Sequence, residues 1–324
     1  MTKSSKIVSL GSALQDIYLT DHDDFTAGQN SEKQSIFNDI VIGSKVDIDH
    51  ISYEVGGGGT NAAVSFSRHG HEAVFLGNIG RDPAGEAVIS TLDQENVDTS
   101  YVSTLPRVKT GCSVVLLDAN TGERTILTHR GASAKFDNLK ADALDDIRPD
   151  WLYVTSLRGD MLTLLSFFEK AHEIGCKIMF NPGVLELKEK QKLLGLIAEI
   201  DVLLVNKSEA ASLVPGTILK ELLSHLTSYT KTVIITDGSM GGIATDGKET
   251  YRFGIYEDVK VKDTTGAGDA FGSGFLAHYA AGNSFKNSLI FGSANSTSVV
   301  HQLGAKAGIL TGREELHPMP IERI

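Results

Sequence analysis

Short apolar runs alternate with amphipathic stretches through residues 151–236. The apolar runs have the length of buried strands and occupy residues 151–155, 177–180, 201–205 and 232–236. Apolar positions at helical spacing fill the stretches between them, at residues 161–174, 187–199 and 207–226. Strands that alternate with helices in this way predict βαβ units and a parallel sheet. A hairpin at residues 242–252 and helices at 267–281 and 285–301 are expected to follow.

The first half of the chain is richer in strand patterns. We predict strands at residues 6–10 and 73–77, and helices from Thr60 to Gly70 and over residues 82–94. Residues 49–55 alternate between apolar and polar, and residues 113–118 and 124–129 flank turn residues as in a hairpin. We therefore expect one α/β domain over residues 1–324, with a discontinuous β lid from about 12–55 and 101–130.

Composition and charge narrow the class of partner. Hydrophobic residues make up 41% of the 324 residues and charged residues 22%, as in ordinary globular proteins. The formal net charge is −11 and no basic stripe occurs, which argues against nucleic acid as the main partner. No apolar run approaches the roughly 18 residues of a membrane span, so no membrane partner is expected. The two cysteines, Cys112 and Cys176, form no disulfide framework, so we expect a cytoplasmic protein.

Polar and glycine-rich segments follow several of the predicted strands. They are Asp16, the run GGGGTN that ends at Asn61, residues 206–209, residues 236–241 and the run DTTGAGD at residues 263–269. The carboxyl ends of strands in an open α/β sheet share one edge, where ligands bind. These segments, from opposite ends of the sequence, are therefore expected to line one cleft.

The stretch DTTGAGDAFGSG, residues 263–274, combines a tight turn with the start of a helix. A turn of this kind presents unpaired backbone N–H groups and the positive end of a helix dipole. Such a site binds anions, most naturally phosphate. Asp269 places one carboxylate among those N–H groups, where it would accept a proton from a group that attacks the anion.

The pair GGGGTN and DTTGAGDAFGSG resembles the two motifs of the ribokinase-like sugar kinases, the PfkB carbohydrate kinase family. Asn181–Gly183, Asn206–Glu209 and Thr236–Gly242 come in the family's order between them, so the resemblance covers essentially the whole chain. It implies a three-layer α/β/α sandwich with a mostly parallel central sheet and a small β-sheet lid. It also implies ATP-dependent transfer of a phosphoryl group to a hydroxyl of a small sugar or related polyol, with Mg²⁺ and, in some members, K⁺.

The resemblance implies a role for each motif residue. Asp269 looks like the catalytic base that takes the hydroxyl proton. The backbone N–H groups of Gly266, Ala267 and Gly268 look like the family's anion hole. The residues that resemble the acceptor-binding set are Asp16, Gly57, Gly58 and Asn61. Asn206 and Glu209 are similar to a pair that orders magnesium through water. Positions that resemble the nucleotide and monovalent-cation sites are Thr236, Gly238 and Gly241 at the phosphates, Asn295 near adenine and Asp263 near the cation.

Three positions depart from the ribokinase pattern. Gly58 stands where ribokinases usually carry a lysine, and Arg158 lies in a stretch where they tend to carry a carboxylate. Arg130 is a second cation after a predicted strand. The departures argue against ribose itself, and two arginines near the acceptor favour an acidic or phosphorylated sugar.

Other interpretations remain open at this point. Asp269 also fits an ordinary helix N-terminal carboxylate, and Asn206 with Glu209 fits a capping pair. A nucleoside kinase would need an apolar slot for its base, for which the lid offers Tyr18, Phe25 and Phe37. A sugar-binding regulator on a retired kinase fold is a third reading, and an oxidoreductase is a distant fourth. Unpaired lid strands would allow a homodimer.

Two further motif readings fail on the sequence. Residues 242–249 nearly spell a phosphate-binding P-loop, but Glu249 stands where Ser or Thr must bind magnesium. The ten histidines show no spacing typical of zinc ligands.

Overall fold

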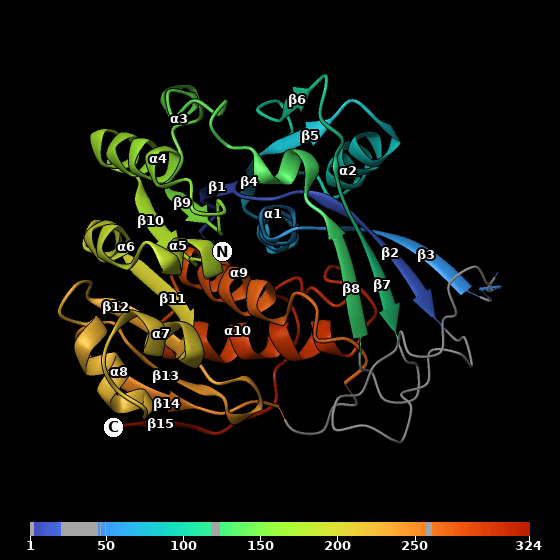
Figure 1. Cartoon of the computed structure of the whole chain (residues 1–324). Helices are drawn as coiled ribbons and strands as arrows, with labels where there is room; N and C mark the ends of the chain where they lie inside the picture. The colour runs from blue at the N-terminus through green and yellow to red at the C-terminus, as the bar shows by residue number, and fades with distance from the viewer. Residues whose placement is uncertain (1–2, 21–44, 46, 49, 118–123, 257–260) are drawn as a thin grey trace.

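A mixed sheet forms the centre of the molecule. The computed structural model describes residues 3–324 apart from 21–44, 46, 49, 118–123 and 257–260. Within these residues, nine strands join in the order β15-β14-β13-β12-β11-β10-β9-β1-β4 (Figure 1). The parallel strands are β4 (Glu72–Leu76), β1 (Lys6–Leu10), β9 (Trp151–Val154), β10 (Lys177–Phe180), β11 (Val202–Asn206) and β12 (Thr232–Thr236). The antiparallel edge is β13 (Gly242–Thr245), β14 (Thr250–Phe253) and β15 (Ile321–Arg323).

Helices cover both faces of this sheet and make a three-layer arrangement. One face carries α1 (Gly58–Arg68), α2 (Pro83–Gln94), α9 (Ala267–Ala280) and α10 (Phe285–Val300). The other carries α3 (Ala143–Ile147), α4 (Met161–Glu173), α5 (Val184–Lys188), α6 (Lys190–Ile197), α7 (Lys207–Leu213) and α8 (Leu219–Leu226). Successive strand residues point to opposite faces, so Tyr153 joins the first core while Leu152 and Val154 join the second. This explains why the parallel strands read as continuous apolar runs.

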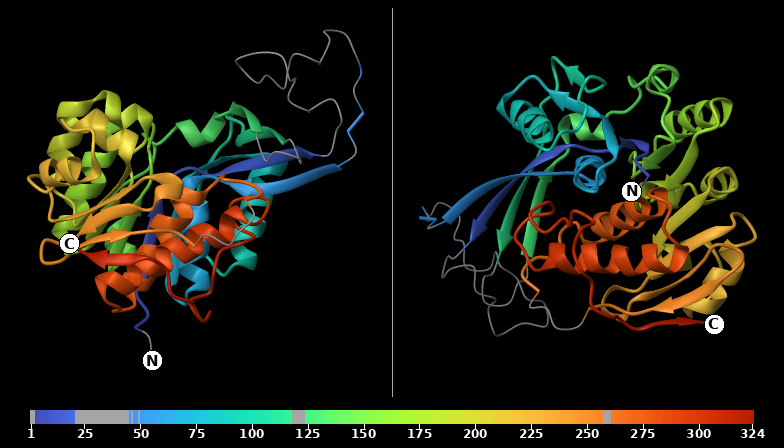
Figure 2. Two further views of the ribbon diagram at one scale, coloured as in Figure 1. Left: turned by 90° about the horizontal axis from the view of Figure 1, so that it is seen from below. Right: turned by 180° about the vertical axis from the view of Figure 1, so that it is seen from behind.

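A second, four-stranded sheet extends from the body (Figure 2). Its strands are β3 (His50–Gly56), β2 (Leu14–Thr20), β7 (Gly111–Leu117) and β8 (Arg124–His129), in that order. β2 pairs antiparallel with β3 and parallel with β7, so segments distant in sequence form one sheet. We call this sheet the lid. A small parallel pair, β5 (Asn78–Gly80) and β6 (Ser103–Leu105), lies between α2 and the short turn of helix at Gly131–Ala134.

The structure corrects the predicted elements at several points. The helix expected at residues 207–226 is two helices, because Pro215 lacks an amide proton and Gly216 adopts a φ of 134° between α7 and α8. The helix expected at 187–199 is likewise divided into α5 and α6. Asp16 lies within lid strand β2 and not in the loop after β1. The predicted hairpin turn at 119–122 lies outside the described residues.

Candidate active site

The carboxyl ends of the parallel strands meet the start of α9. A cavity of about 210 Å³ at this edge is lined by Asn181 after β10, Asn206 of β11, Thr236 of β12, Glu209 of α7 and residues of the 264–269 turn. As the sequence predicted, the nucleotide-side motifs and the DTTGAGD turn therefore share one cleft. The exceptions and the acceptor-side residues are described below.

The turn before α9 depends on glycine at one position. Gly266 caps the helix with a left-handed φ of 78°, and a Cβ atom there would lie 2.5 Å from the Cβ of Ala305. The amide of Ala267 donates to the Thr264 carbonyl at 3.3 Å. Among the described residues, the amides of Gly268 and Asp269 have no acceptor, so the first turn of α9 offers two N–H groups to an anion.

Asp269 lies in the first turn of α9, is half-buried and lines the cavity. Its Oδ2 atom accepts a hydrogen bond of 2.9 Å from Nδ2 of Asn61, which lies on α1. Burial raises the pKa of the Asp269 carboxyl, while the Asn61 bond and the positive charge of Lys306 oppose that rise. The hydroxyl of Tyr153 lies under Gly272 near Asp269, and it has no hydrogen-bond partner in the described structure.

Glycines keep the acceptor side open. A Cβ on Gly58 would lie 3.2 Å from Oδ1 of Asp269, so any side chain there would enter the space in front of the carboxylate. Gly57 has a φ of 103°, which disfavours other residues. Asp16 is buried at 7% exposure, accepts a hydrogen bond from the Ser113 hydroxyl and lies against Gly56. Burial raises the pKa of the Asp16 carboxyl, against the effects of Ser113 and nearby cations.

Arg130 and Arg158 lie close enough to influence each other. Burial and the charge of Arg158 lower the pKa of the Arg130 guanidinium, while the Asp16 carboxylate raises it. Neither arginine forms an ion pair with any described residue. Arg158 adopts a φ of 57°, unusual for a residue with a side chain. Arg130 therefore lies near both Arg158 and Asp16, and the structure gives no such link between Arg158 and Asp16 among the described residues.

Glu186 supports the strained loop that carries Arg158. The Glu186 side chain is fully buried, and its carboxylate accepts from the Ser156 hydroxyl and the Gly159 amide, both at 2.8 Å. It also accepts from the Gly183 amide at 3.0 Å. The Ser156 hydroxyl in turn accepts from the Arg158 amide at 3.1 Å. A buried carboxylate that accepts three hydrogen bonds fixes this loop in one conformation.

Asn206 and Glu209 form a reciprocal capping box at the start of α7. Glu209 Oε2 accepts from the Asn206 amide at 2.8 Å, and Asn206 Oδ1 accepts from the Glu209 amide at 2.9 Å. Burial raises the pKa of Glu209, and the bonds from Asn206 oppose the rise. Glu209 Oε1 makes no bond within the described residues, although both side chains line the cavity. The structure therefore confirms the capping interpretation of this pair.

The loop after β12 is a tight glycine turn. Gly238 and Gly241 have φ values of 55° and 78°, and they bound the single helical turn Gly238–Met240. A Cβ on Gly241 would meet the Phe253 carbonyl oxygen at 2.0 Å, so close packing requires glycine there. Lys207 Nζ binds Asp237 Oδ2 at 2.9 Å and ties this loop to the start of α7.

Two of the predicted residues, Asn295 and Tyr18, are buried inside the protein. Asn295 has 0% exposure, with Nδ2 donating to the Ala270 carbonyl at 2.7 Å and Oδ1 accepting from the Leu310 amide at 2.8 Å. Both ends of its amide are thus bonded to the protein, which places it in the core. Tyr18 is fully buried and donates to Asp263 Oδ2 at 3.1 Å, so it forms no open slot for a base. Phe25 and Phe37 lie outside the described residues.

Asp263 is a buried carboxylate that accepts hydrogen bonds from three segments of the chain. It has 1% exposure, and its carboxylate accepts from the Tyr18 hydroxyl, the Thr265 amide at 2.8 Å and the Gly304 amide at 3.3 Å. It therefore ties a lid strand, the DTTGAGD turn and the segment after α10 together. The described residues contain no group of three or more His, Cys, Asp or Glu side chains arranged to hold a metal ion.

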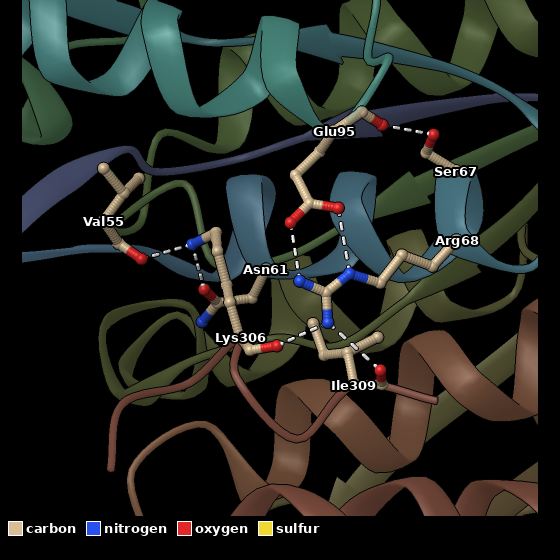
Figure 3. A network of polar contacts seen from close by, with 7 residues as sticks. All are labelled: Val55, Asn61, Ser67, Arg68, Glu95, Lys306 and Ile309. Carbon is tan, nitrogen blue, oxygen red and sulfur yellow. Dashed lines mark hydrogen bonds and ion pairs between the residues drawn. The ribbon is translucent and has the colours of Figure 1, made fainter. Parts of the chain in front are cut away.

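Lys306, from the segment after α10, was not among the predicted site residues. Its side chain is buried at 7% exposure, and its ammonium donates to the Val55 carbonyl and to Asn61 Oδ1 at 2.6 Å (Figure 3). The ammonium also donates to Thr60 Oγ1 at 3.0 Å. Burial lowers the pKa of Lys306 to about 7, although nearby carboxylates favour the charged form. A single lysine in the run LGAKAG carries no local signal of this placement.

Comparisons with known proteins bear on the family and the fold of the chain. The sequence profile of the pfkB family carbohydrate kinases matches residues 5–311. A ribokinase of Haemophilus influenzae is 28% identical over 274 residues, which cover 81% of this chain and 86% of that protein. An adenosine kinase from Sinorhizobium meliloti has a similar structure, with a TM-score of 0.78 at 20% identity over 96% of this chain and 98% of that one.

A second solved structure is the ribokinase of Arabidopsis thaliana complexed with ribose and ATP. Its TM-score is 0.75 at 22% identity, and the match covers 94% of this chain and 95% of that one. At these identities the two solved structures establish the fold, and the predicted α/β class with a mostly parallel sheet and a second small sheet is confirmed. No helix in the described part of the chain combines the length and apolar character of a membrane span.

Proposed function

Because the chain belongs to the pfkB family of carbohydrate kinases, we propose that it transfers the γ-phosphoryl group of ATP to a hydroxyl of a small sugar or related polyol. Members of this family are ATP-dependent phosphotransferases, and sugar and nucleoside kinases share the fold. The observation that carries the proposal is the position of Asp269. Its carboxylate lies beside the free amides that open α9, and Asn61 from the other motif holds it.

Asp269 is the proposed catalytic base. The acceptor hydroxyl would bind in the space that Gly58 leaves in front of Oδ1, and Asp269 would take its proton as the oxygen attacks phosphorus. The bond from the phosphorus to the β-bridging oxygen breaks as the new one forms, and ADP leaves. Burial raises the pKa of the Asp269 carboxyl, which strengthens the carboxylate as a base.

The start of α9 is the proposed anion hole. The amides of Gly268 and Asp269 and the helix dipole would bind the transferred group, with the backbone of Gly266 and Ala267 close against it. Thr236, Gly238 and Gly241 are the proposed contacts for the nucleotide phosphates. Bound Mg²⁺ would neutralise phosphate charge, and Oε1 of Glu209 would hold it through water. Asp263 is the proposed neighbour of a K⁺ site.

Arg130 and Arg158 favour an acceptor that carries a carboxylate or phosphate. Arg130 lies near both Asp16 and Arg158, and neither guanidinium has an ion-pair partner in the described part of the chain, so the two would bind such a group in a bidentate manner. Asp16 and Asn61 would bind the acceptor hydroxyls.

A homodimer through the lid is also proposed, because its edge strands expose the apolar side chains of Ile51, Tyr53, Ile126 and Leu127.

An adenosine-type nucleoside kinase is the second candidate. The similarity in fold to the adenosine kinase of Sinorhizobium meliloti favours it. The burial of Tyr18 against Asp263 argues the other way, because that ring does not offer a stacking surface for a base.

An acceptor screen tests the proposal. ADP release is measured with Mg²⁺, with and without K⁺, across neutral sugars, sugar acids, sugar phosphates and nucleosides. The proposal predicts fastest turnover with an anionic sugar or polyol. Fastest turnover with adenosine would favour the nucleoside kinase, and no turnover with any acceptor would support a sugar-binding regulator.

A further inference from the structure

A buried ammonium group stands behind the proposed base. Lys306 Nζ donates to Asn61 Oδ1 at 2.6 Å, and Asn61 Nδ2 donates to Asp269 Oδ2 at 2.9 Å. The Asn61 carboxamide has one acceptor and two donor hydrogens, so the ammonium can only engage its oxygen. This leaves the amide nitrogen to face Asp269. The three side chains come from the segment after α10, from α1 and from α9.

A second network fixes the backbone that carries Lys306 (Figure 3). Arg68, at the end of α1, donates to the carbonyls of Lys306 at 2.8 Å and Ile309 at 3.1 Å. Glu95, which follows α2, holds the same guanidinium with bonds of 2.9 and 2.6 Å. The lysine is thus attached to α1 at both ends, through its backbone to Arg68 and through its side chain to Thr60 and Asn61.

We propose that Lys306 is a positioning residue that orients the Asn61 amide toward Asp269 and supplies the positive charge that keeps the Asp269 carboxylate ionised. This inference rests on the proposed phosphoryl transfer and adds a residue outside both sequence motifs. The ammonium hydrogens of Lys306 bond to the Val55 carbonyl, Thr60 and Asn61. Lys306 therefore acts on Asp269 through Asn61 and through the electric field of its charge.

The charges around Lys306 support this role. The carboxylates whose charges act on the ammonium are Asp16 from β2, Asp269 from α9, Glu54 from β3 and Glu95 after α2. The groups that act on Asp269 are Asn61 and Lys306, and Tyr153 from β9 lies nearby. Burial is the largest influence on Asp269, and removal of the ammonium takes away one of the two groups that oppose it. The pKa of Asp269 would rise, and a larger share of the base would be protonated at a given pH.

A double-mutant cycle tests the connection through Asn61. The variants are Lys306→Met, Asn61→Ala and the double variant, assayed with the acceptor that the wild type turns over fastest. We expect each single variant to lower kcat roughly ten- to hundred-fold, because small displacements of a base are costly. The double variant should be no more than about three-fold slower than the slower single variant. Losses that multiply, or an unchanged kcat in Lys306→Met, would overturn the inference.

The pH dependence separates positioning from a purely structural role. In Lys306→Met the acidic limb of the kcat/KM profile should move up by roughly one pH unit. Lys306→Gln keeps a hydrogen-bond donor but loses the charge, so it should show the same shift. This variant replaces Lys306→Met in the test if the methionine variant does not fold. A lower kcat with an unmoved limb would contradict the inference. Lys286→Met, on the exposed face of α10, is the matched control and should change nothing.

A measurement without turnover keeps the two proposals apart. Titration of the Asp269 carboxyl carbon by ¹³C NMR in the unliganded protein should show a higher pKa in Lys306→Met than in the wild type. An unchanged pKa would overturn the inference even if the wild type is an active kinase. A raised pKa in a protein that turns over no acceptor would support the electrostatic connection while the proposed phosphoryl transfer fails.

Discussion

Asn61 Nδ2 lies 2.9 Å from Asp269 Oδ2, and this hydrogen bond joins the two glycine-rich motifs across 208 residues of sequence. Neither motif forms a site alone, because α1 supplies the amide while α9 supplies the carboxylate and the free N–H groups. In the proposed phosphoryl transfer, the acceptor and the phosphate would meet beside this bond.

Replacement of Asn61 by Asp should disturb Asp269 directly. A second carboxylate at this distance disfavours ionisation of the first, so the pKa of Asp269 would rise. We expect the acidic limb of the kcat/KM profile to shift to higher pH, with turnover at pH 7 reduced roughly ten-fold or more. A profile that matches the wild type would show that Asn61 does not control the ionisation of Asp269.

Two glycines in the same turn should respond differently to alanine. At Gly266 a side chain would need a left-handed φ and would clash with Ala305, so Gly266→Ala should lose about 1–3 kcal/mol of unfolding free energy. At Gly268 a Cβ atom would meet open space, with nothing described within 4 Å of it, so Gly268→Ala should fold normally. Its methyl group would crowd the phosphoryl oxygens and lower kcat/KM for ATP at least about ten-fold.

Thermal melts and initial-rate kinetics on both variants test this pair. Equal stability of the two proteins would contradict the account of the turn. Full activity of Gly268→Ala would show that no phosphoryl group approaches this backbone.

Arg158→Ala should reveal the acceptor class. Loss of a charge-assisted contact is expected to raise KM for an anionic acceptor roughly ten- to hundred-fold and to leave KM for neutral sugars unchanged. Arg148→Ala is the matched control, because Arg148 also has a left-handed φ, of 51°, and its side chain is 66% exposed. An equal effect on anionic and neutral acceptors would remove the anion-binding role.

A cluster of histidines away from the cavity should make the fold sensitive to acid. The ring centroid of His69 lies 5.5 Å from that of His71 and 5.8 Å from that of His278, and both His69 nitrogens lack partners among the described residues. Burial, with the charges of those two histidines, lowers the pKa of His69 to about 4. The unfolded chain therefore binds more protons between pH 6.5 and 4, and stability falls as pH decreases through that window.

Replacement of His69 by Phe should reduce this sensitivity. The ring already packs edge-on against Phe291 at 5.0 Å, so an apolar ring suits the site. Denaturant unfolding at pH 7 and pH 5 should show a loss of stability about 1–2 kcal/mol smaller in His69→Phe than in the wild type. An equal loss in both proteins would exclude His69 as the source.

Much of the fold could be predicted because its signals are local. The parallel strands are short apolar runs buried on both faces, and each ends at polar or glycine residues such as Thr236 and Asn206 that also carry the site. The division between α7 and α8 also has a local signal, in Pro215 and Gly216, but the helical period on either side masked it. Strand β15 was not predicted because three residues carry too weak a pattern.

The parts of the site that could not be predicted depend on contacts between distant segments. Lys306 reaches Asn61 across 245 residues, and no pattern around it differs from that of a surface lysine. Asn295 shows the reverse case, because its place in the sequence resembles a nucleotide contact while packing of α10 against α9 buries it completely. Burial and partner identity are properties of the folded chain, and a single sequence does not reveal them.

Asp269→Asn is the most direct test of the account. The substitution keeps the shape of the side chain and removes its ability to take a proton, so phosphoryl transfer should fall about 10²–10⁴-fold. The affinity for ATP, measured by calorimetry, should remain close to that of the wild type. Asp142→Asn, at a carboxylate that is 87% exposed, should behave as the wild type in both assays. Turnover by Asp269→Asn within ten-fold of the wild type would contradict the assignment of Asp269 as the base.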